Sequence, residues 1–393
     1  MLAIEEVPGW QYVGGSSWQQ LLLQALEEMI ISDRNHPSII SFGVRVNESA
    51  DNHTLYTQTN NLARQLDPTR QTHGVRKSNG STSEFLEDVW TRNFYIPTGF
   101  PNPSPWVTSE TVGHNFPTHS WDSNQHQIDH LFEHVDCQST NYRNSSIGGV
   151  LGWCAFDYNS SHNNAVILEG GSYVSYHGVA DIFRIPKIAG YFFQSQRDPK
   201  LYGPMVYITH QWEGALSPNT VTVVSNCDEV ELFINSSSQG RIRPNRNTEL
   251  PHGLFQFSNI SFQSGEISAF GYINGSQAAV HTRRTPGSPA ALLIKPDNNT
   301  LYDSGDMTRV VVTVMDQYGQ VVPRADNSVT LSVSGPGEFL GKSPIVLEDG
   351  KTAFYVETRA RQTGIITCMA SSQSLESDST TIEVLPSKER FDF

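Results

Sequence analysis

The sequence predicts a multi-domain protein in which an α/β segment is followed by two all-β modules. Up to about residue 200, buried strands alternate with helices, which is typical of parallel β/α units in a barrel or an open sheet. Beyond that point the hydrophobic pattern changes to a period of two, in short strands separated by Asn, Ser and Gly turns. These two patterns together define the predicted fold class.

The α/β segment contains four strand patterns and three helix patterns. The expected strands are Leu2–Ile4, Ser38–Val46, Trp106–Ser109 and Gly148–Phe156. The expected helices are Trp18–Ile31, Tyr56–Leu66 and Ser123–Val135. Ser16 or Ser17 can cap the first helix, and Pro68 ends the second.

The all-β part divides at a predicted linker, Thr282–Ala291, which reads "TRRTPGSPAA". Alternating runs such as "TVTVVSNCDEVELFIN" precede it, and runs such as "TRVVVTVMDQYGQVV" follow it. Each block has the size of a β-sandwich domain, about 80 to 100 residues. We therefore expect three domains, at residues 1–200, 201–285 and 286–393.

Composition excludes several classes of protein. Hydrophobic residues make up 37% of the chain and aromatic residues 10%, as in a globular protein. The net charge of −14 argues against a nucleic-acid partner, and no apolar run is long enough for a membrane span. The four cysteines lack metal-site spacing and do not predict a disulfide framework. Only Cys137 and Cys154 are placed to form a bridge.

The first ten residues, "MLAIEEVPGW", resemble the interior of a domain. They contain neither a basic n-region nor a cleavage site, so no signal peptide is predicted, and we expect a truncated start. Glycosylation sequons suggest an exported parent protein without fixing its compartment. They occur at Asn47, Asn52, Asn79, Asn144, Asn159, Asn235, Asn259, Asn274 and Asn298.

Two glutamates follow predicted strands: Glu48 comes after "SIISFGVRVN" and Glu110 after "WVTS". Side chains at the carboxyl ends of barrel strands converge on one face, where active sites lie. Paired carboxylates on such a face suit glycoside hydrolysis. A single glutamate at a strand end is usually a solvated surface residue, so the pair alone does not decide the function.

The surrounding motifs sharpen this interpretation. The run "SDRNHPSIISFGVRVNES" resembles the acid/base signature of glycoside hydrolase family 2, and "VTSETVGHNFPT" resembles its nucleophile segment. Further matches, in order, are "EEVPGW", "LDPTRQTHGVR", "GWCAFDYN" and "YHGVADIFRIPKIAGYFFQSQ". The ordered set is similar to the β-galactosidase-like branch of the family and covers nearly all of residues 1–200.

The resemblance implies an incomplete (β/α)8 TIM barrel followed by two immunoglobulin-like β-sandwich domains. It implies that Glu48 is the general acid/base and that Glu110 is the nucleophile. Their carboxyl groups should then lie about 5 to 5.5 Å apart, as in retaining glycosidases. Asn47 would hydrogen-bond the 2-hydroxyl of the sugar, which leaves its sequon unused.

Secondary candidates line the predicted site. The resemblance places Trp153 as an aromatic wall, although a core tryptophan is an equal alternative. Glu6, His114 and Asp157 are polar residues at strand ends that could contact substrate, while His114 could equally brace the Glu110 loop. No metal-ligand spacing occurs and no cofactor is required, so a bound Mg²⁺ or Na⁺ would be accessory.

The chain departs from the family pattern in three places. Phe42 replaces a usual tryptophan, and the usual tyrosine after the sixth strand has no clear match, with Tyr95 the nearest residue and not counted as catalytic. The family's N-terminal sandwich, immunoglobulin-like domain and first two barrel strands would precede "EEVPGW". We therefore expect low or no activity from the 393-residue chain alone.

The leading function is a retaining exo-β-glycosidase that acts on β-galactosides, with a carbohydrate substrate. The alternative is a non-catalytic carbohydrate-binding or structural remnant of such an enzyme, and an adhesin-like role is a third reading of residues 289–385. The absence of a glucuronidase-type Asn-x-Lys run argues against glucuronate. The sequence fixes neither the sugar nor the oligomeric state.

Overall fold

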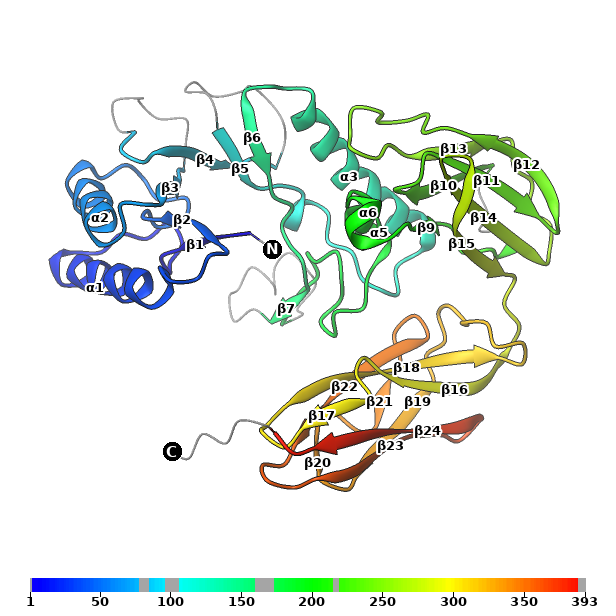
Figure 1. Ribbon diagram of the computed structural model, residues 1–393. Coiled ribbons are helices and arrows are strands. Elements are labelled where there is room, and N and C mark those ends of the chain that lie inside the picture. The colour runs from blue at the N-terminus through cyan, green and yellow to red at the C-terminus, as the bar shows by residue number, and fades with distance from the viewer. Residues whose placement is uncertain (1, 78–84, 96–105, 160–172, 215–218, 388–393) are drawn as a thin grey trace. The chain divides into compact units, whose positions relative to one another are not determined.

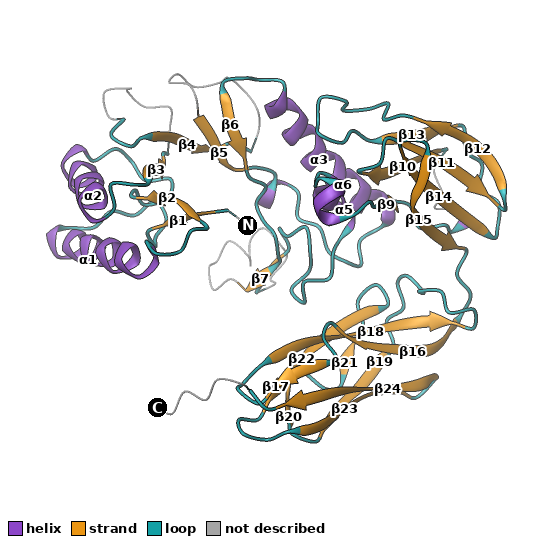
Figure 2. Ribbon diagram, viewed as in Figure 1, coloured by secondary structure: helices purple, strands orange, loops and turns teal. Residues whose placement is uncertain are grey.

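The computed structural model describes residues 2–77, 85–95, 106–159, 173–214 and 219–387 (Figure 1). The chain forms two compact units, one of residues 1–117 and 131–178, the other of residues 118–130 and 179–393. The described helices all end by Tyr202, and strands make up the ordered structure beyond it (Figure 2). The predicted order, α/β first and all-β second, is confirmed.

Six parallel strands form one sheet in the first unit, in the order β1–β2–β3–β4–β5–β6. Neighbours in the sequence are neighbours in the sheet, as in a β/α barrel. The strands are β1 Ala3–Glu6, β2 Ile39–Gly43, β3 Gln71–Val75, β4 Val89–Asn93, β5 Trp106–Glu110 and β6 Ile147–Val150. A short antiparallel pair follows, β7 Tyr158–Asn159 with β8 Val174–Ser175. The predicted incomplete barrel is confirmed.

Helices connect several of these strands. They are α1 Ser16–Asp33, α2 His53–Leu66, the 3-10 turn η2 Gly113–Asn115 and α3 Asn124–Tyr142. In α1 the buried residues Leu22, Leu26 and Ile30 are four apart, which places them on one side of the helix. The side chain of Asn52 caps α2 by accepting a hydrogen bond from the amide of Leu55 at 3.1 Å.

Strand boundaries differ from the prediction in three respects. The strand expected over Ser38–Val46 is shorter, because β2 spans Ile39–Gly43. The polar sequences "QTHGV" and "VWTRN" form β3 and β4, which the hydrophobic pattern does not single out. The predicted strand Gly148–Phe156 is too long, because β6 ends at Val150 and Trp153 follows in an isolated bridge to Val112. An apolar run indicates burial, but it does not show where the backbone leaves the sheet.

A β-sandwich occupies the first part of the second unit, after the short helices α5 Ile188–Ser195 and α6 Pro199–Tyr202. One sheet has the order β13–β10–β9 and the other β12–β11–β14–β15. The strands are β9 Val206–Ile208, β10 Thr220–Ser225, β11 Glu229–Ile234, β12 Ser237–Ile242, β13 Phe255–Ser258, β14 Glu266–Ile273 and β15 Ser276–Arg284. Alternate residues of β11, Val230, Leu232 and Ile234, are buried between the sheets.

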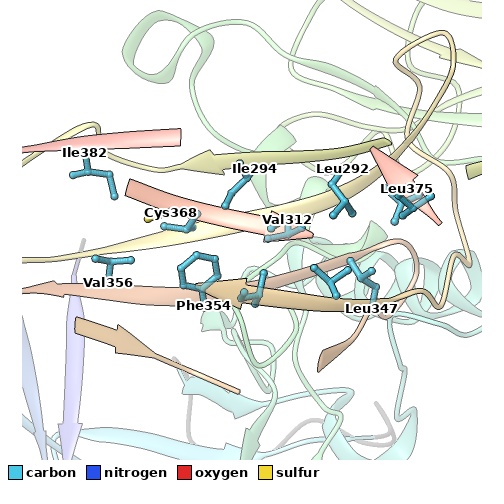
Figure 3. Close-up of a cluster of buried hydrophobic side chains, with 14 of the residues drawn as sticks. Leu292, Ile294, Val312, Leu347, Phe354, Val356, Cys368, Leu375 and Ile382 are labelled. Atoms are coloured by element: carbon cyan, nitrogen blue, oxygen red, sulfur yellow. The ribbon is translucent and has the colours of Figure 1, made fainter. Parts of the chain in front are cut away.

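A second sandwich follows, whose strands are linked in the order β20–β22–β18–β16–β24–β23–β19–β21, with β17 paired to β24. The strands are β16 Pro289–Pro296, β17 Thr300–Tyr302, β18 Met307–Asp316, β19 Ser328–Ser334, β20 Gly337–Leu340, β21 Ile345–Val346, β22 Lys351–Thr358, β23 Gly364–Ser372 and β24 Leu375–Leu385. Figure 3 shows two layers with their apolar side chains facing each other, Ile382 and Cys368 from one and Val356 and Phe354 from the other.

The predicted linker Thr282–Ala291 is shorter in the structure, because β15 continues to Arg284 and β16 begins at Pro289. β15 is the edge strand of its sheet, so many of its residues are polar and exposed. For that reason the end of this strand resembles a linker in the sequence. All four cysteines are free thiols. Among the described residues, no helix has the length and apolar character needed to cross a membrane.

Candidate active site

Polar side chains meet at the carboxyl edge of the parallel sheet. Glu110 is the last residue of β5, and its register partner Asn93 is the last residue of β4. Asn47 and Glu48 lie beyond β2, in the segment that leads to α2. Because parallel strands end at the same edge of a sheet, the fold collects these four residues in one place.

The segment that carries Asn47 and Glu48 is held by its neighbours on both sides. The amide of Glu48 donates to the carbonyl of Val75 at 3.0 Å, and Asn47 forms a parallel bridge to Trp10. Glu48 has a φ of +52°, in the left-handed region that non-glycine residues rarely adopt. Such a conformation costs about 1–3 kcal/mol and persists only where the surrounding structure enforces it.

A chain of amide hydrogen bonds joins the two glutamates. Asn47 donates from Nδ2 to Oε1 of Glu110 at 3.3 Å. Asn93 donates from Nδ2 to Oε1 of Glu48 at 3.1 Å and to Oδ1 of Asn47 at 3.3 Å. Ser109 in turn donates to Oδ1 of Asn93 at 2.9 Å, which orients that amide. The two carboxylates therefore face a common site, separated by a pair of asparagines.

Glu48 has donors on its other oxygen. Trp10 donates from its indole nitrogen to Oε2 at 2.9 Å, and Gln11 donates from Nε2 to the same oxygen at 3.2 Å. The charge of Glu48 also acts on Arg92, partly offsetting the burial that lowers the pKa of that guanidinium. Two neutral donors and a nearby cation thus fix the orientation of the Glu48 side chain.

Glu110 lies in a more buried setting. Burial raises the pKa of Glu110, and the negative charge of Glu48 raises it further. Hydrogen bonds from Tyr95, Asn93 and Asn47 act in the opposite direction and favour the ionised carboxylate. The Tyr95 hydroxyl donates to Oε2 of Glu110 in a short hydrogen bond. Burial raises the pKa of Tyr95, and the charge of Glu110 raises it further, so the hydroxyl stays protonated and remains a donor.

Trp153 lies beside this network. Its backbone amide donates to the carbonyl of Thr111 at 2.9 Å, and its ring meets the Tyr158 ring edge-on at 5.9 Å. Gly113 lies between the rings of Trp153 and Tyr95. A methyl group added to Gly113 would lie 2.7 Å from Cδ1 of Trp153 and 3.1 Å from Cε1 of Tyr95. Trp153 is therefore packed next to the tyrosine that binds Glu110.

The remaining predicted residues make other contacts. Asp157 is buried and accepts a hydrogen bond from the amide of Gly178 at 2.8 Å. Oε1 of Glu6 lies 3.3 Å from Nε2 of His73. Glu6 pairs in register with Gly43, the last residue of β2, whereas Glu48 lies in the segment beyond that strand. His114 belongs to η2, and its side chain lies outside the described residues.

Sequence reasoning did not select four residues that touch the pair directly. Asn93 joins both glutamates through the amide chain, and Tyr95 binds Glu110. Trp10 and Gln11 bind Glu48. Asn93 obeys the same strand-end rule that selected Glu110, but the polar strand β4 was not recognised. Trp10 reaches Glu48 only through the tertiary bridge to Asn47, which no local pattern reveals.

A buried ion-pair cluster supports the segment behind Glu48. Arg45 pairs with Glu87 at 2.9 Å, and both side chains are only 1% exposed. Arg45 also pairs with Asp51 at 3.0 Å, and Arg76 binds the same carboxylate at 2.7 Å. The Arg45 guanidinium lies 4.1 Å from the centre of the Tyr56 ring. These contacts connect the loop after β2 to residues that follow β3.

Replacing Glu87 by glutamine is expected to destabilise this unit by about 3–5 kcal/mol, because a buried arginine loses its fully buried counter-charge. Calorimetric unfolding of the whole chain measures the change. The matched control is Glu338→Gln, whose partner Arg359 is 3.7 Å away with both side chains about half exposed, and the change there should stay within about 1 kcal/mol. Equal effects of the two substitutions would contradict the structural role of Glu87.

The parallel β/α sheet, the paired glutamates and the β-sandwiches define the class: β/α-barrel glycoside hydrolases with added β-domains. Residues 10–111 match the model "Glycosyl hydrolases family 2, TIM barrel domain", and residues 292–381 match "Glycoside hydrolase family 2 C-terminal domain 5". Residues 217–279 match a domain of unknown function, DUF4982. Residues 10–111 and 292–381 thus carry domains of glycoside hydrolase family 2.

Several known proteins resemble this chain over most of its length. The β-galactosidase of Thermoanaerobacter pseudethanolicus is 39% identical over 96% of this chain and 53% of its own length. The β-galactosidase of Thermoanaerobacterium thermosulfurigenes is 34% identical over 89% of this chain and 52% of its own. A solved family 2 β-glucuronidase, 21% identical, superposes with a TM-score of 0.75 over 98% of this chain and 42% of that chain. The chain thus spans about half the length of these curated relatives.

Proposed function

We propose that the chain is the catalytic part of a retaining exo-β-glycosidase acting on β-galactosides. The observation that carries the proposal is the hydrogen-bonded chain Glu48–Asn93–Asn47–Glu110 at the carboxyl edge of the sheet. It holds two carboxylates toward one site, as double displacement requires. The two relatives named β-galactosidase support the choice of sugar.

In the first step Glu110 attacks the anomeric carbon and forms a glycosyl ester. Glu48 gives its proton to the departing glycosidic oxygen. In the second step Glu48, now ionised, takes a proton from water, and that water displaces Glu110 from the anomeric carbon with overall retention. Asn47 would bind the 2-hydroxyl next to the bond that forms, where its contact strengthens at the transition state. Both roles are filled by carboxylates, so the reaction needs no metal.

Tyr95 positions Glu110 in this scheme. Replacing Tyr95 by phenylalanine is expected to lower kcat about 10- to 100-fold, because a hydrogen bond to a charged group is lost. That hydrogen bond lowers the pKa of Glu110, so its loss raises this pKa further and moves the acidic limb of the rate profile to higher pH. The deficit should therefore be largest at low pH.

The control for Tyr95 is Tyr142→Phe, which removes an exposed hydroxyl at the end of α3. Its rate and pH profile should match those of the unsubstituted chain. A Tyr95→Phe variant whose acidic limb stays in place would show that the hydroxyl does not act on Glu110.

A covalent label tests the whole proposal. A 2-deoxy-2-fluoro-β-galactosyl fluoride should transfer its sugar to the carboxylate of Glu110 and release fluoride, and peptide mass spectrometry should locate the ester. Glu110→Gln should remain unlabelled. A folded chain that takes up no label would favour the non-catalytic remnant, and a label on another residue would overturn the assignment of Glu110.

A further inference from the structure

The second unit contains a pocket of about 230 Å³ whose walls come from α5, β9, β15 and the turns around Gln320 and Asp349. It is smaller than the roughly 300–1,000 Å³ of pockets that hold drug-sized ligands. None of its lining residues belongs to the glutamate network. Its size suits a ligand of about one ring.

Two donors at this pocket are fixed in place by backbone contacts. Nδ1 of His281 accepts a hydrogen bond from the amide of Ile208 at 3.1 Å, so the ring proton lies on Nε2. Burial and the charge of Arg283 lower the pKa of His281 to about 3, which leaves the ring neutral. Arg283 donates from Nε to the carbonyl of Ile208 at 3.1 Å and from Nη2 to the Tyr207 hydroxyl at 2.7 Å. Among the described residues, Nε2 of His281 and Nη1 of Arg283 have no hydrogen-bond acceptor.

Side chains with hydrogen-bond acceptors also line this pocket. Gln211 is only 8% exposed, and its Oε1 has no hydrogen-bond donor within the part of the chain that the structure describes. A buried oxygen left without a partner destabilises the protein, so a ligand that donates to it is favoured. Oδ1 of Asp349 accepts a hydrogen bond from the amide of Arg324 at 3.0 Å. Burial raises the pKa of Asp349, and the nearby charges of Lys351 and Arg283 act in the opposite direction.

Apolar surface completes the walls. The rings of Tyr191 and Tyr207 are stacked with centroids 3.6 Å apart, and the His281 ring stacks on Tyr207 at 4.6 Å. Val321 and Pro323 also line the pocket. The lining thus combines stacked aromatic rings with hydrogen-bond donors and acceptors.

This lining excludes several ligand classes. A phosphate would meet the carboxylates of Asp349 and Glu213, while a metal ion would meet Arg283 and Lys351. An apolar ligand would leave the polar groups unpartnered. A hydroxyl group both donates and accepts, so a neutral molecule with several hydroxyls and a C–H face satisfies all parts of the lining. We propose that this pocket binds one ring of a neutral sugar, as a non-catalytic carbohydrate site.

The site is tested in the full chain carrying Asn47→Ala and Glu110→Gln, which removes turnover and weakens binding at the catalytic edge. D-galactose, D-glucose, sodium phosphate and calcium chloride are titrated separately by isothermal calorimetry, with saturation-transfer NMR as a second readout. At least one hexose should bind. Asp349→Asn, which keeps an oxygen for the Arg324 amide, and Lys351→Gln should each weaken that binding about tenfold. Lys295→Gln, an exposed lysine outside the pocket, should leave it unchanged.

Two outcomes would overturn the proposal in variants that keep the thermal unfolding midpoint of the parent chain. In one, neither hexose binds, or hexose binding is unaffected by both pocket substitutions. In the other, only phosphate or only calcium binds, and this binding is lost in the Lys351→Gln or the Asp349→Asn variant. That result would make the pocket an ion-binding site. The fluorosugar label on Glu110 is a separate readout, so failure of the catalytic proposal and failure of this one are distinguishable.

Discussion

Replacing Glu110 by glutamine is expected to reduce kcat for an aryl β-galactoside by about five orders of magnitude, or about 7 kcal/mol of barrier. The amide keeps the shape of the side chain and its place beside Tyr95 and Asn47. It cannot attack the anomeric carbon, so double displacement stops at its first step. The informative quantity is the ratio of the variant's rate to that of the unsubstituted chain, whatever the absolute rate.

Two controls separate chemistry from folding. Glu27→Gln, an exposed position on α1, should leave the rate within a factor of about two, in line with the small effects of surface substitutions. Glu110→Gly with added azide should form α-galactosyl azide, because azide enters from the face that Glu110 occupied. A β-configured product from this variant, or near-normal activity of Glu110→Gln, would assign the nucleophile elsewhere.

Replacing Glu48 by alanine is expected to give a loss that depends on the leaving group. For an alkyl β-galactoside, which needs protonation to depart, kcat should fall about 10²- to 10⁴-fold. A dinitrophenyl galactoside departs without that proton, so its first step should survive. The glycosyl-enzyme should then accumulate because no base activates water, and stopped-flow absorbance should show a burst of dinitrophenol.

Azide distinguishes the two glutamates. In the Glu48→Ala variant, azide attacks the glycosyl-enzyme in place of water. The product should be β-galactosyl azide, whose configuration is opposite to that of the Glu110→Gly product, and the steady-state rate should recover. If both leaving groups suffered equally and azide restored nothing, Glu48 would have only a structural role next to Trp10 and Asn93.

The hydrophobic pattern predicts much of the architecture because each element buries one face. The helix expected over Trp18–Ile31 is α1, and the alternating runs beyond residue 219 are strands of the two sandwiches. The pattern failed for β3 and β4 because these strands are polar. Thr72 and His73 are buried with hydrogen bonds to other elements, and Thr91 is buried by packing, which only the tertiary structure provides. Burial in the barrel does not require apolar residues at every position.

The site was predictable where it depends on strand ends and not where it depends on contacts between loops. Glu48 and Glu110 were selected from their places after strands and Asn47 from the family resemblance, and the structure links the three by hydrogen bonds. Glu6, the last residue of β1, obeyed the same rule, but its carboxylate lies against His73. Tyr95 lies beyond the end of β4, so its side-chain direction could not be read from the sequence.

The left-handed backbone at Glu48 places opposing demands on that position. Such a φ favours glycine, asparagine or aspartate, which adopt it with least strain. Asparagine and glycine would supply no carboxylate, and aspartate is one methylene shorter and would withdraw it from Trp10 and Asn93. A library that selects for thermal stability should therefore enrich these short residues at position 48, while one that selects for turnover should return glutamate alone.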